Sequence, residues 1–225
     1  MIPWEFLDSA RVPDGDGEIG LYRRGQEYSI RVGNRELMNS RVHASEEALA
    51  EMACARIANR TRPWILVGGL GMGFTLAAVL RGLSAGGAVL VAELVPAVVS
   101  WNRGPLAALA GHPLRDARVT VKEVDVGHIL RAERQAFDAI LLDVDNGPAA
   151  LGRQKNDWLY ARPGLEAAHA ALRPAGVLAV WSAAPNRIFT QRLRRNGFTV
   201  DEVRTSAHSS GKGRRHTIWL AGRTS

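Results

Sequence analysis

The chain contains very little cysteine, with Cys54 the single example among 225 residues. One thiol excludes a disulfide framework within the chain and argues against a cysteine-based metal cluster. Cys54 lies in a stretch of helical periodicity, so we expect it to be a small core residue. The six histidines show no spacing typical of metal ligands, and we expect no metal site.

Long apolar runs are also absent, and no segment approaches the length of a membrane span. The first residues, Met1 to Glu5, lack the basic and apolar regions of a signal peptide, which favours a cytoplasmic protein. No internal repeat and no Gly-x-Ser-x-Gly nucleophile motif occurs. What remains is an ordinary globular composition, with 46% hydrophobic residues, long enough for one large domain and a small appendage.

The charge balance is basic, with a formal net charge of +7. This favours anionic or phosphate-rich partners, nucleic acid among them, although it bears on association rather than on fold. The arginines are spread along the chain, so a solvated basic surface is the simpler interpretation. The segment 206–215, rich in Ser, Gly and basic residues, is expected to form a mobile loop.

The most informative stretch is 63–93. Ile65 to Val67 is a short apolar run typical of a buried strand, and four glycines follow it within six residues: Gly68, Gly69, Gly71 and Gly73. A helical pattern, a second apolar strand and then Glu93 complete the stretch. Strand, glycine turn, helix, strand and acid are the parts of a nucleotide-binding βαβ unit.

Each part has a physical reason. Glycine allows positive φ and close approach of a ligand to the backbone, and the helix start offers free N–H groups. An acid about 20 residues after the loop can accept hydrogen bonds from both ribose hydroxyls. The alternative is a tight turn followed by an ordinary surface glutamate.

Elsewhere the pattern predicts two parts. Residues 1–43 carry short alternating runs separated by turn residues, which predict a β-hairpin or three-stranded meander. Residues 44–225 alternate strands and helices, which predicts a Rossmann-like α/β domain with a mostly parallel, doubly wound sheet and one antiparallel strand beside its edge. Ser45 precedes two acids and is expected to cap a helix over 46–59.

Acidic residues follow three successive predicted strands: Glu93, Asp125, and Asp143 with Asp145. Ligands of such sheets bind outside the carboxyl ends of the strands, so these carboxylates are expected around one pocket. Each alone could be a helix cap or a solvated loop acid.

The order of these segments resembles the spermidine synthase-like branch of the class I S-adenosylmethionine-dependent transferases, over about residues 18–205. The matching parts are the glycine loop, Ala92-Glu93, Val124-Asp125, Leu142-Asp143 and the passage from Leu172 to Leu178. The resemblance implies that Gly68 to Gly73 lie against the methionine part of the cofactor. It also implies that Glu93 holds the ribose, Asp125 the adenine amino group, and Asp143 the acceptor.

Around the acceptor, Asp143 and Asp145 are the candidate catalytic carboxylates. Asp143 is expected to orient an amine or take its proton, because in-line attack on a sulfonium carbon needs a close, deprotonated nucleophile. Further candidates for contact with the substrate are Asn146 and three aromatic residues that could face a cation or simply pack in the core, Trp158, Tyr160 and Trp181.

The chain also departs from the aminopropyltransferases of this branch. They carry an aspartate in the glycine loop that contacts the amine of decarboxylated S-adenosylmethionine, and this chain has Gly71 there. A glutamine and a Tyr-His pair that seat the polyamine correspond to Ser40 and Leu49-Ala50. These departures favour methyl transfer from intact S-adenosylmethionine to a small amine or other polar acceptor.

Three alternatives stay open. The first is aminopropyl transfer from decarboxylated S-adenosylmethionine, as in polyamine synthesis. The second is a nucleic-acid-binding protein with this fold, and the third is a non-catalytic nucleoside-binding relative. A homodimer would be in keeping with the resemblance.

Overall fold

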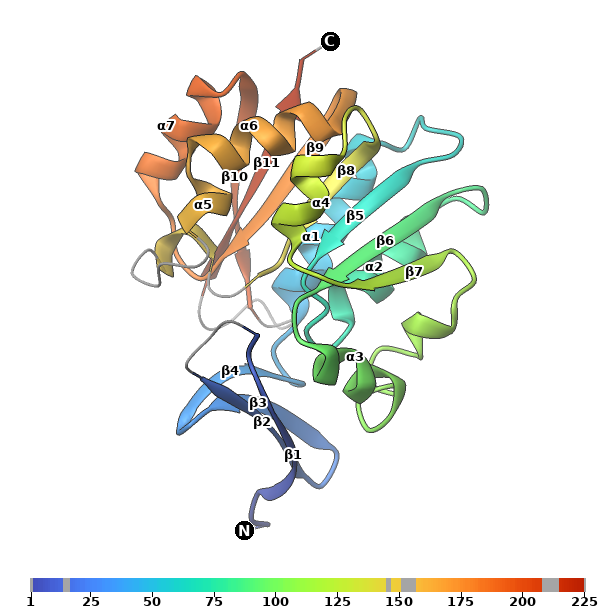
Figure 1. Ribbon diagram of the computed structural model, residues 1–225, viewed down its shortest axis with the longest axis vertical. Helices are drawn as coiled ribbons and strands as arrows, with labels where there is room; N and C mark the ends of the chain where they lie inside the picture. Colours follow the sequence, from blue (N-terminus) through green and yellow to red (C-terminus); the bar gives the residue numbers. More distant parts are fainter. Residues whose placement is uncertain (1, 14–16, 145–146, 151–156, 208–214, 225) are drawn as a thin grey trace.

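The computed structural model describes residues 2–13, 17–144, 147–150, 157–207 and 215–224. Two sheets organise these residues, and the small one lies beyond the carboxyl ends of the large one's central strands (Figure 1). The two chain termini lie at opposite ends of the molecule.

The small sheet is antiparallel and four-stranded, in the order β1-β2-β3-β4. Its strands are β1 (Glu5–Arg11), β2 (Glu18–Arg24), β3 (Glu27–Val32) and β4 (Arg35–Asn39). The sequence predicted at most three strands here, because β1 lacks a clear apolar alternation and is held mainly by its pairing with β2. Ile19, Leu21 and Ile30 of this sheet are buried in the same core as α1 and α2, so the small sheet does not stand alone.

The large sheet has seven strands in the order β10-β11-β9-β8-β5-β6-β7. They are β5 (Trp64–Gly68), β6 (Ala88–Glu93), β7 (Val119–Glu123), β8 (Phe137–Leu142), β9 (Leu172–Ser182), β10 (Phe198–Ser206) and β11 (Arg215–Arg223). Strands β7, β6, β5, β8 and β9 are mutually parallel, whereas β11 runs antiparallel to both β9 and β10. The predicted Rossmann-like sheet with one antiparallel strand beside its edge is confirmed, and β11 is that strand.

Helices cover both faces of this sheet (Figure 1). One face packs on α1 (Ala44–Arg56), α2 (Phe74–Gly82) and α3 (Pro96–Arg103). The other packs on α4 (Val126–Ala132), α5 (Asp157–Tyr160), α6 (Arg162–Ala171) and α7 (Arg187–Arg195). Alternate residues of β5 serve the two cores, Ile65 and Val67 in the first and Leu66 in the second, as expected for a strand buried on both sides.

One expected helix cap is wrong. Helix α1 starts at Ala44 after His43, and no side chain caps it. The Ser45 hydroxyl instead lies 2.8 Å from Nδ1 of His216 and accepts a 3.0 Å bond from the Trp181 indole. Ser45 is therefore a buried link between α1, β9 and β11. None of the described helices has the length and apolar character needed to cross a membrane.

Candidate functional site

The glycine loop joins β5 to α2, and its backbone geometry needs glycine at two points. Gly69 has φ +88°, and a Cβ on it would lie 2.4 Å from the carbonyl oxygen of Asp143. Gly73 has φ +86° at the start of α2, where a Cβ would lie 2.9 Å from Oδ1 of Asn102. The glycines thus allow β5, β8 and α3 to meet closely at the end of the sheet.

Glu93 closes the loop from the neighbouring strand. Its side chain is 7% exposed, and its two carboxylate oxygens accept 2.8 Å bonds from the backbone N–H groups of Leu70 and Val95. Glu93 therefore both shapes the loop and lies where the βαβ unit would hold a ribose.

Asn102 is a second residue that holds the loop, and sequence reasoning missed it. It is buried on α3, and its Nδ2 donates to the carbonyl of Gly71 at 2.8 Å and to that of Val98 at 2.9 Å. An asparagine far from the loop in sequence carries no motif that would have pointed to this contact.

Asp125 lies at the start of α4, after β7. Its Oδ1 accepts a 2.6 Å bond from the backbone N–H of Gly127, so it is an N-cap with its other oxygen available. Trp158 lies beside this helix start, because a Cβ on Gly127 would meet its ring at 3.0 Å. Trp158 also stacks on the Arg131 guanidinium, 3.7 Å from the ring centroid.

Asp143 follows β8, and its backbone lies against the glycine loop. Its backbone N–H donates to the carbonyl of Gly68 at 3.0 Å, and its Oδ2 accepts a 2.6 Å bond from the Thr75 hydroxyl of α2. Burial raises the pKa of Asp143 to about 6, against the opposing effect of the Thr75 hydrogen bond. A carboxylate with such a pKa can take a proton near neutral pH.

Asp143 opens into a pocket between the glycine loop, α1 and the small sheet. Its empty volume, including the mouth, is about 440 Å³. The lining residues are Leu37, Met38, Glu46, Leu70, Gly71, Met72, Phe74, Thr75, Asp143 and Trp181. Among these described residues two are acids and none is Lys, Arg or His, so the pocket favours a cation with a short apolar chain.

The second acid is Glu46 on α1, which sequence reasoning missed as a site residue. Its Oε2 is buried and has no hydrogen-bond partner among the described residues. Burial, then the negative charges of Asp143 and Glu47, raise the pKa of Glu46 well above its usual range. Acidic residues in a first helical turn are commonly explained by the helix dipole. The position of Glu46 in the sequence therefore gave no reason to predict it as a site residue.

The predicted aromatic residues divide between two places. Trp181 lines the pocket, with its ring held by Ser45 and set edge-on to His216 at 4.7 Å. Tyr160 is buried against Phe189 and donates to the carbonyl of Val144, and Trp158 lies beside α4, so neither lines the pocket. Asp145 and Asn146 lie outside the described residues.

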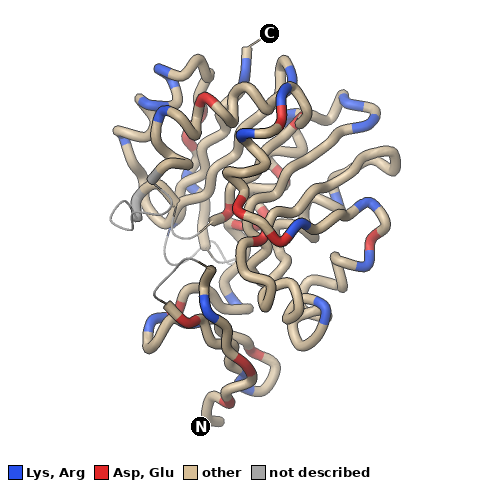
Figure 2. The backbone as a smooth tube through the Cα atoms, in the orientation of Figure 1, with Lys and Arg blue, Asp and Glu red and all other residues tan. Residues whose placement is uncertain are grey.

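The sequence-predicted cofactor residues thus come together at one edge of the sheet. Gly68, Gly69, Gly71 and Gly73, Glu93, Asp125 and Asp143 all follow or end the adjacent strands β8, β5, β6 and β7. Figure 2 shows several acidic positions close together at this edge, whereas basic positions are distributed around the periphery. No group of three or more His, Cys, Asp or Glu side chains suited to a metal occurs in the described part of the chain.

Comparisons with known proteins give one consistent result. No family model matches the sequence, and no curated protein is significantly similar to it. Solved structures do match. A spermidine synthase in complex with the transition state analogue AdoDATO has a TM-score of 0.74 at 17% identity, over 97% of this chain and 72% of the other.

Two further structures agree. A spermidine synthase from Thermotoga maritima has a TM-score of 0.71 at 18% identity, covering 97% of this chain and 72% of the other. A probable spermidine synthase from Corynebacterium glutamicum ATCC 13032 has 0.64 at 14%, covering 97% and 79%. At these identities the likeness concerns the fold alone: the chain has the fold of these spermidine synthase structures.

Proposed function

We propose that this protein is a transferase that moves an aminopropyl group from decarboxylated S-adenosylmethionine to a small amine. The observation that carries the proposal is the pocket beside the glycine loop, which is lined by the carboxylates of Glu46 and Asp143 and by no basic side chain among the described residues. A donor that bears an ammonium group suits such a pocket. An intact cofactor would bring its carboxylate into the same negative surroundings, which costs free energy.

This proposal reverses the preference for methyl transfer drawn from Gly71. The loss of the loop aspartate removes one negative charge, but the structure has Glu46 facing the same pocket from α1. The likeness to spermidine synthases, one of them crystallised with a transition state analogue, also supports aminopropyl transfer. Methyl transfer would place the cofactor carboxylate near Glu46 and Asp143, which both carry negative charge when ionised.

The chemistry assigns simple tasks to the described residues. The nucleoside would lie along Gly69 to Gly73, with Glu93 toward its ribose and Asp125 toward its adenine. The acceptor nitrogen attacks the aminopropyl carbon bonded to sulfur, the C–S bond breaks, and its electron pair stays on sulfur, which leaves a neutral thioether. The attacking amine loses its proton to Asp143, which Thr75 orients. General-base help of this kind contributes about 10²–10⁴-fold to the rate.

Mass spectrometry of the products tests the proposal. The purified protein is incubated with a panel of primary diamines and monoamines, and with either decarboxylated or intact S-adenosylmethionine. We expect products heavier by one aminopropyl group, and a loss of roughly 100-fold or more in rate for Asp143→Asn. The surface variant Asp201→Asn is the matched control. Methylated products from the intact cofactor would contradict the proposal.

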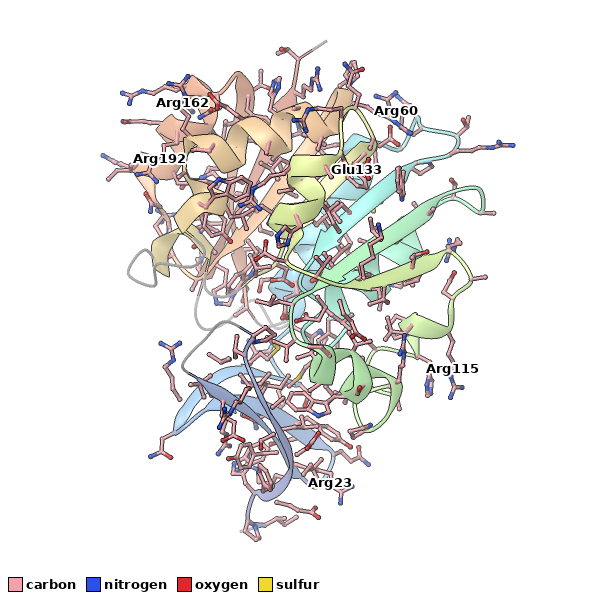
Figure 3. The ribbon with its side chains drawn as sticks, in the orientation of Figure 1. Arg23, Arg60, Arg115, Glu133, Arg162 and Arg192 are labelled. Carbon is pink, nitrogen blue, oxygen red and sulfur yellow. The ribbon has the colours of Figure 1, made fainter. Side chains whose placement is uncertain are left out.

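A second candidate, nucleic-acid binding, is supported by one specific surface. Helix α7 exposes Arg187, Ile188, Gln191, Arg194 and Arg195, which lie on one side at helical spacing. No ion pair with a described acid neutralises these arginines. Figure 3 labels Arg192 of this helix and Arg162 of α6, and both lie on the outer side of the part of the molecule that is built around the large sheet. An unneutralised arginine stripe can contact successive phosphates.

Salt-dependent binding tests this candidate. If the stripe binds a nucleic-acid backbone, affinity for an oligonucleotide falls steeply with salt concentration. In the variant R187Q/R194Q/R195Q, the slope of log affinity against log salt concentration should then correspond to about three fewer phosphate contacts. The variant R11Q/R35Q/R62Q removes the same charge from exposed positions elsewhere and serves as control. If both variants weaken oligonucleotide binding equally, the effect comes from net charge, and the proposal that α7 is the binding surface is contradicted.

A further inference from the structure

The carboxylate of Glu46 has no structural task in the described part of the chain. The neighbouring acid Glu47 pairs with Arg81 at 3.3 Å and lies 3.6 Å from His43, whereas Oε2 of Glu46 is buried without a hydrogen-bond partner. A buried carboxylate without a partner costs several kcal/mol in general. Such groups are rare in folded proteins, and a bound ligand is one way in which the missing partner is supplied.

The surroundings of Glu46 indicate what that partner is. The same pocket holds Asp143, and its other walls are apolar or small, including Met38, Phe74 and Trp181. Two acids with no basic side chain among the described lining residues favour a cationic ligand, and apolar walls disfavour a strongly hydrated metal ion. A primary ammonium on a short alkyl chain meets both conditions, because it donates three hydrogen bonds.

From this we infer that Glu46 is the residue that selects the donor: its carboxylate binds the primary ammonium of the aminopropyl group and rejects a cofactor that carries a carboxylate. This rests on the proposed function and assigns its selectivity to α1. The glycine loop contributes no charge here, because Gly71 lines the pocket beside Met38, with Met38 Sδ 3.3 Å from where a Cβ would lie. Asp143 then serves the attacking amine of the acceptor.

Paired binding measurements test the inference without requiring turnover. Calorimetric titration gives the ratio of affinities for decarboxylated and intact S-adenosylmethionine, in the wild type and in Glu46→Gln. The wild type is expected to favour the decarboxylated compound. Glu46→Gln should reduce that ratio by roughly tenfold to a hundredfold, because it removes a charge-assisted hydrogen bond and the repulsion of a carboxylate together.

Two further variants test whether the effect depends on the position of the charge. Glu51→Gln removes a charge from the exposed side of the same helix, where the Glu51 side chain is 67% exposed, and its affinity ratio should equal that of the wild type. Glu46→Asp keeps the charge but withdraws it by one methylene group, and its ratio should lie between those of the wild type and Glu46→Gln.

The outcomes separate the inference from the function. A Glu46→Gln ratio equal to that of the wild type overturns the inference even if aminopropyl products form. A wild type that binds both compounds equally also overturns it. A wild type that favours the decarboxylated compound through Glu46 but makes no aminopropyl product supports the inference, and overturns the proposed reaction alone.

Discussion

The Thr75 hydroxyl donates a 2.6 Å hydrogen bond to Oδ2 of Asp143, which joins the first turn of α2 to the end of β8 inside the pocket. Thr75 is 2% exposed, so water does not readily replace this donor. The bond stabilises the ionised carboxylate and therefore opposes the rise in pKa that burial causes. Thr75 is thus a positioning residue that also adjusts the acid–base behaviour of Asp143.

Thr75→Val removes that donor with little change of shape. We expect the pKa of Asp143 to rise further, so that the acid limb of the pH–rate profile moves to higher pH by about one unit. Thr75→Ser keeps the hydroxyl and should keep the wild-type profile. A Thr75→Val profile that coincides with the wild type would show that another group is titrating.

Stability of the ligand-free protein should depend on pH through the same carboxylate. The pKa of Asp143 is raised to about 6 in the folded state, and the pKa of Glu46 is raised as well. The folded protein therefore holds more protons than the unfolded chain, and this stabilisation is fully present below the unfolded pKa of about 4 and lost as pH rises through the folded value.

Denaturant unfolding at about pH 5 and about pH 8, compared between the wild type and Asp143→Asn, measures the effect. The free energy of unfolding of the wild type should fall relative to the variant by at most about 1.4 kcal/mol, since only the one pH unit between pH 5 and the folded pKa of about 6 lies in this range. Part of the Asp143 side chain is still solvent-accessible, so a smaller value is expected. A wild type that gains stability over this range relative to the variant would have the opposite sign and refute the assignment.

Glu93→Gln tests whether Glu93, the proposed ribose ligand, also stabilises the glycine loop. The two oxygens of the carboxylate accept from Leu70 N and Val95 N, one each. The glutamine amide has a single oxygen, so it can replace only one of these two acceptors. We expect a loss of about 1–3 kcal/mol in unfolding free energy, together with weaker nucleoside binding. Glu123→Gln, at the paired position on β7 and exposed, should change neither quantity.

Gly69→Ala should be far more harmful than an alanine at another left-handed glycine. Both Gly69 and Gly111 have positive φ, and strain of that kind costs about 1–3 kcal/mol. At Gly111 nothing lies within 4 Å of the new Cβ, whereas at Gly69 the Asp143 carbonyl oxygen lies 2.4 Å away. We expect Gly111→Ala to stay active, and Gly69→Ala to unfold more easily and lose activity. Thermal unfolding and initial rates compare the two.

The parts of the fold that sequence could predict are those with local causes. Ile65 to Val67, the glycine turn and Glu93 follow from strand apolarity, backbone freedom and the length of one βαβ unit. The small sheet was under-predicted because β1 depends on pairing rather than on its own pattern. Ser45 has the chemistry of an N-cap, yet tertiary contacts with Trp181 and His216 take its hydroxyl.

The candidate site divides in the same way. Carboxylates at strand ends are predictable because parallel strands end at one edge. Glu46 lines the pocket because the first turn of α1 lies beside the glycine loop in the folded protein. The residues around Glu46 in the sequence give no sign of this placement. Trp181 follows the apolar residues of a strand and Trp158 follows polar residues, but neither context says which ring lines the pocket. Only the topology assigns Trp181 to the pocket and Trp158 to the side of α4.

The pocket has walls from two separate parts of the chain, and this affects how its selectivity can change. Leu37 and Met38 come from β4 of the small sheet, whereas Gly71, Thr75 and Asp143 come from the glycine loop, α2 and the end of β8. Substitutions in β4 can therefore remodel the space offered to an acceptor and leave Glu93 and Asp125 untouched. We therefore expect substitutions in β4 to change which acceptor the proposed enzyme takes, while the residues proposed to hold the nucleoside stay the same.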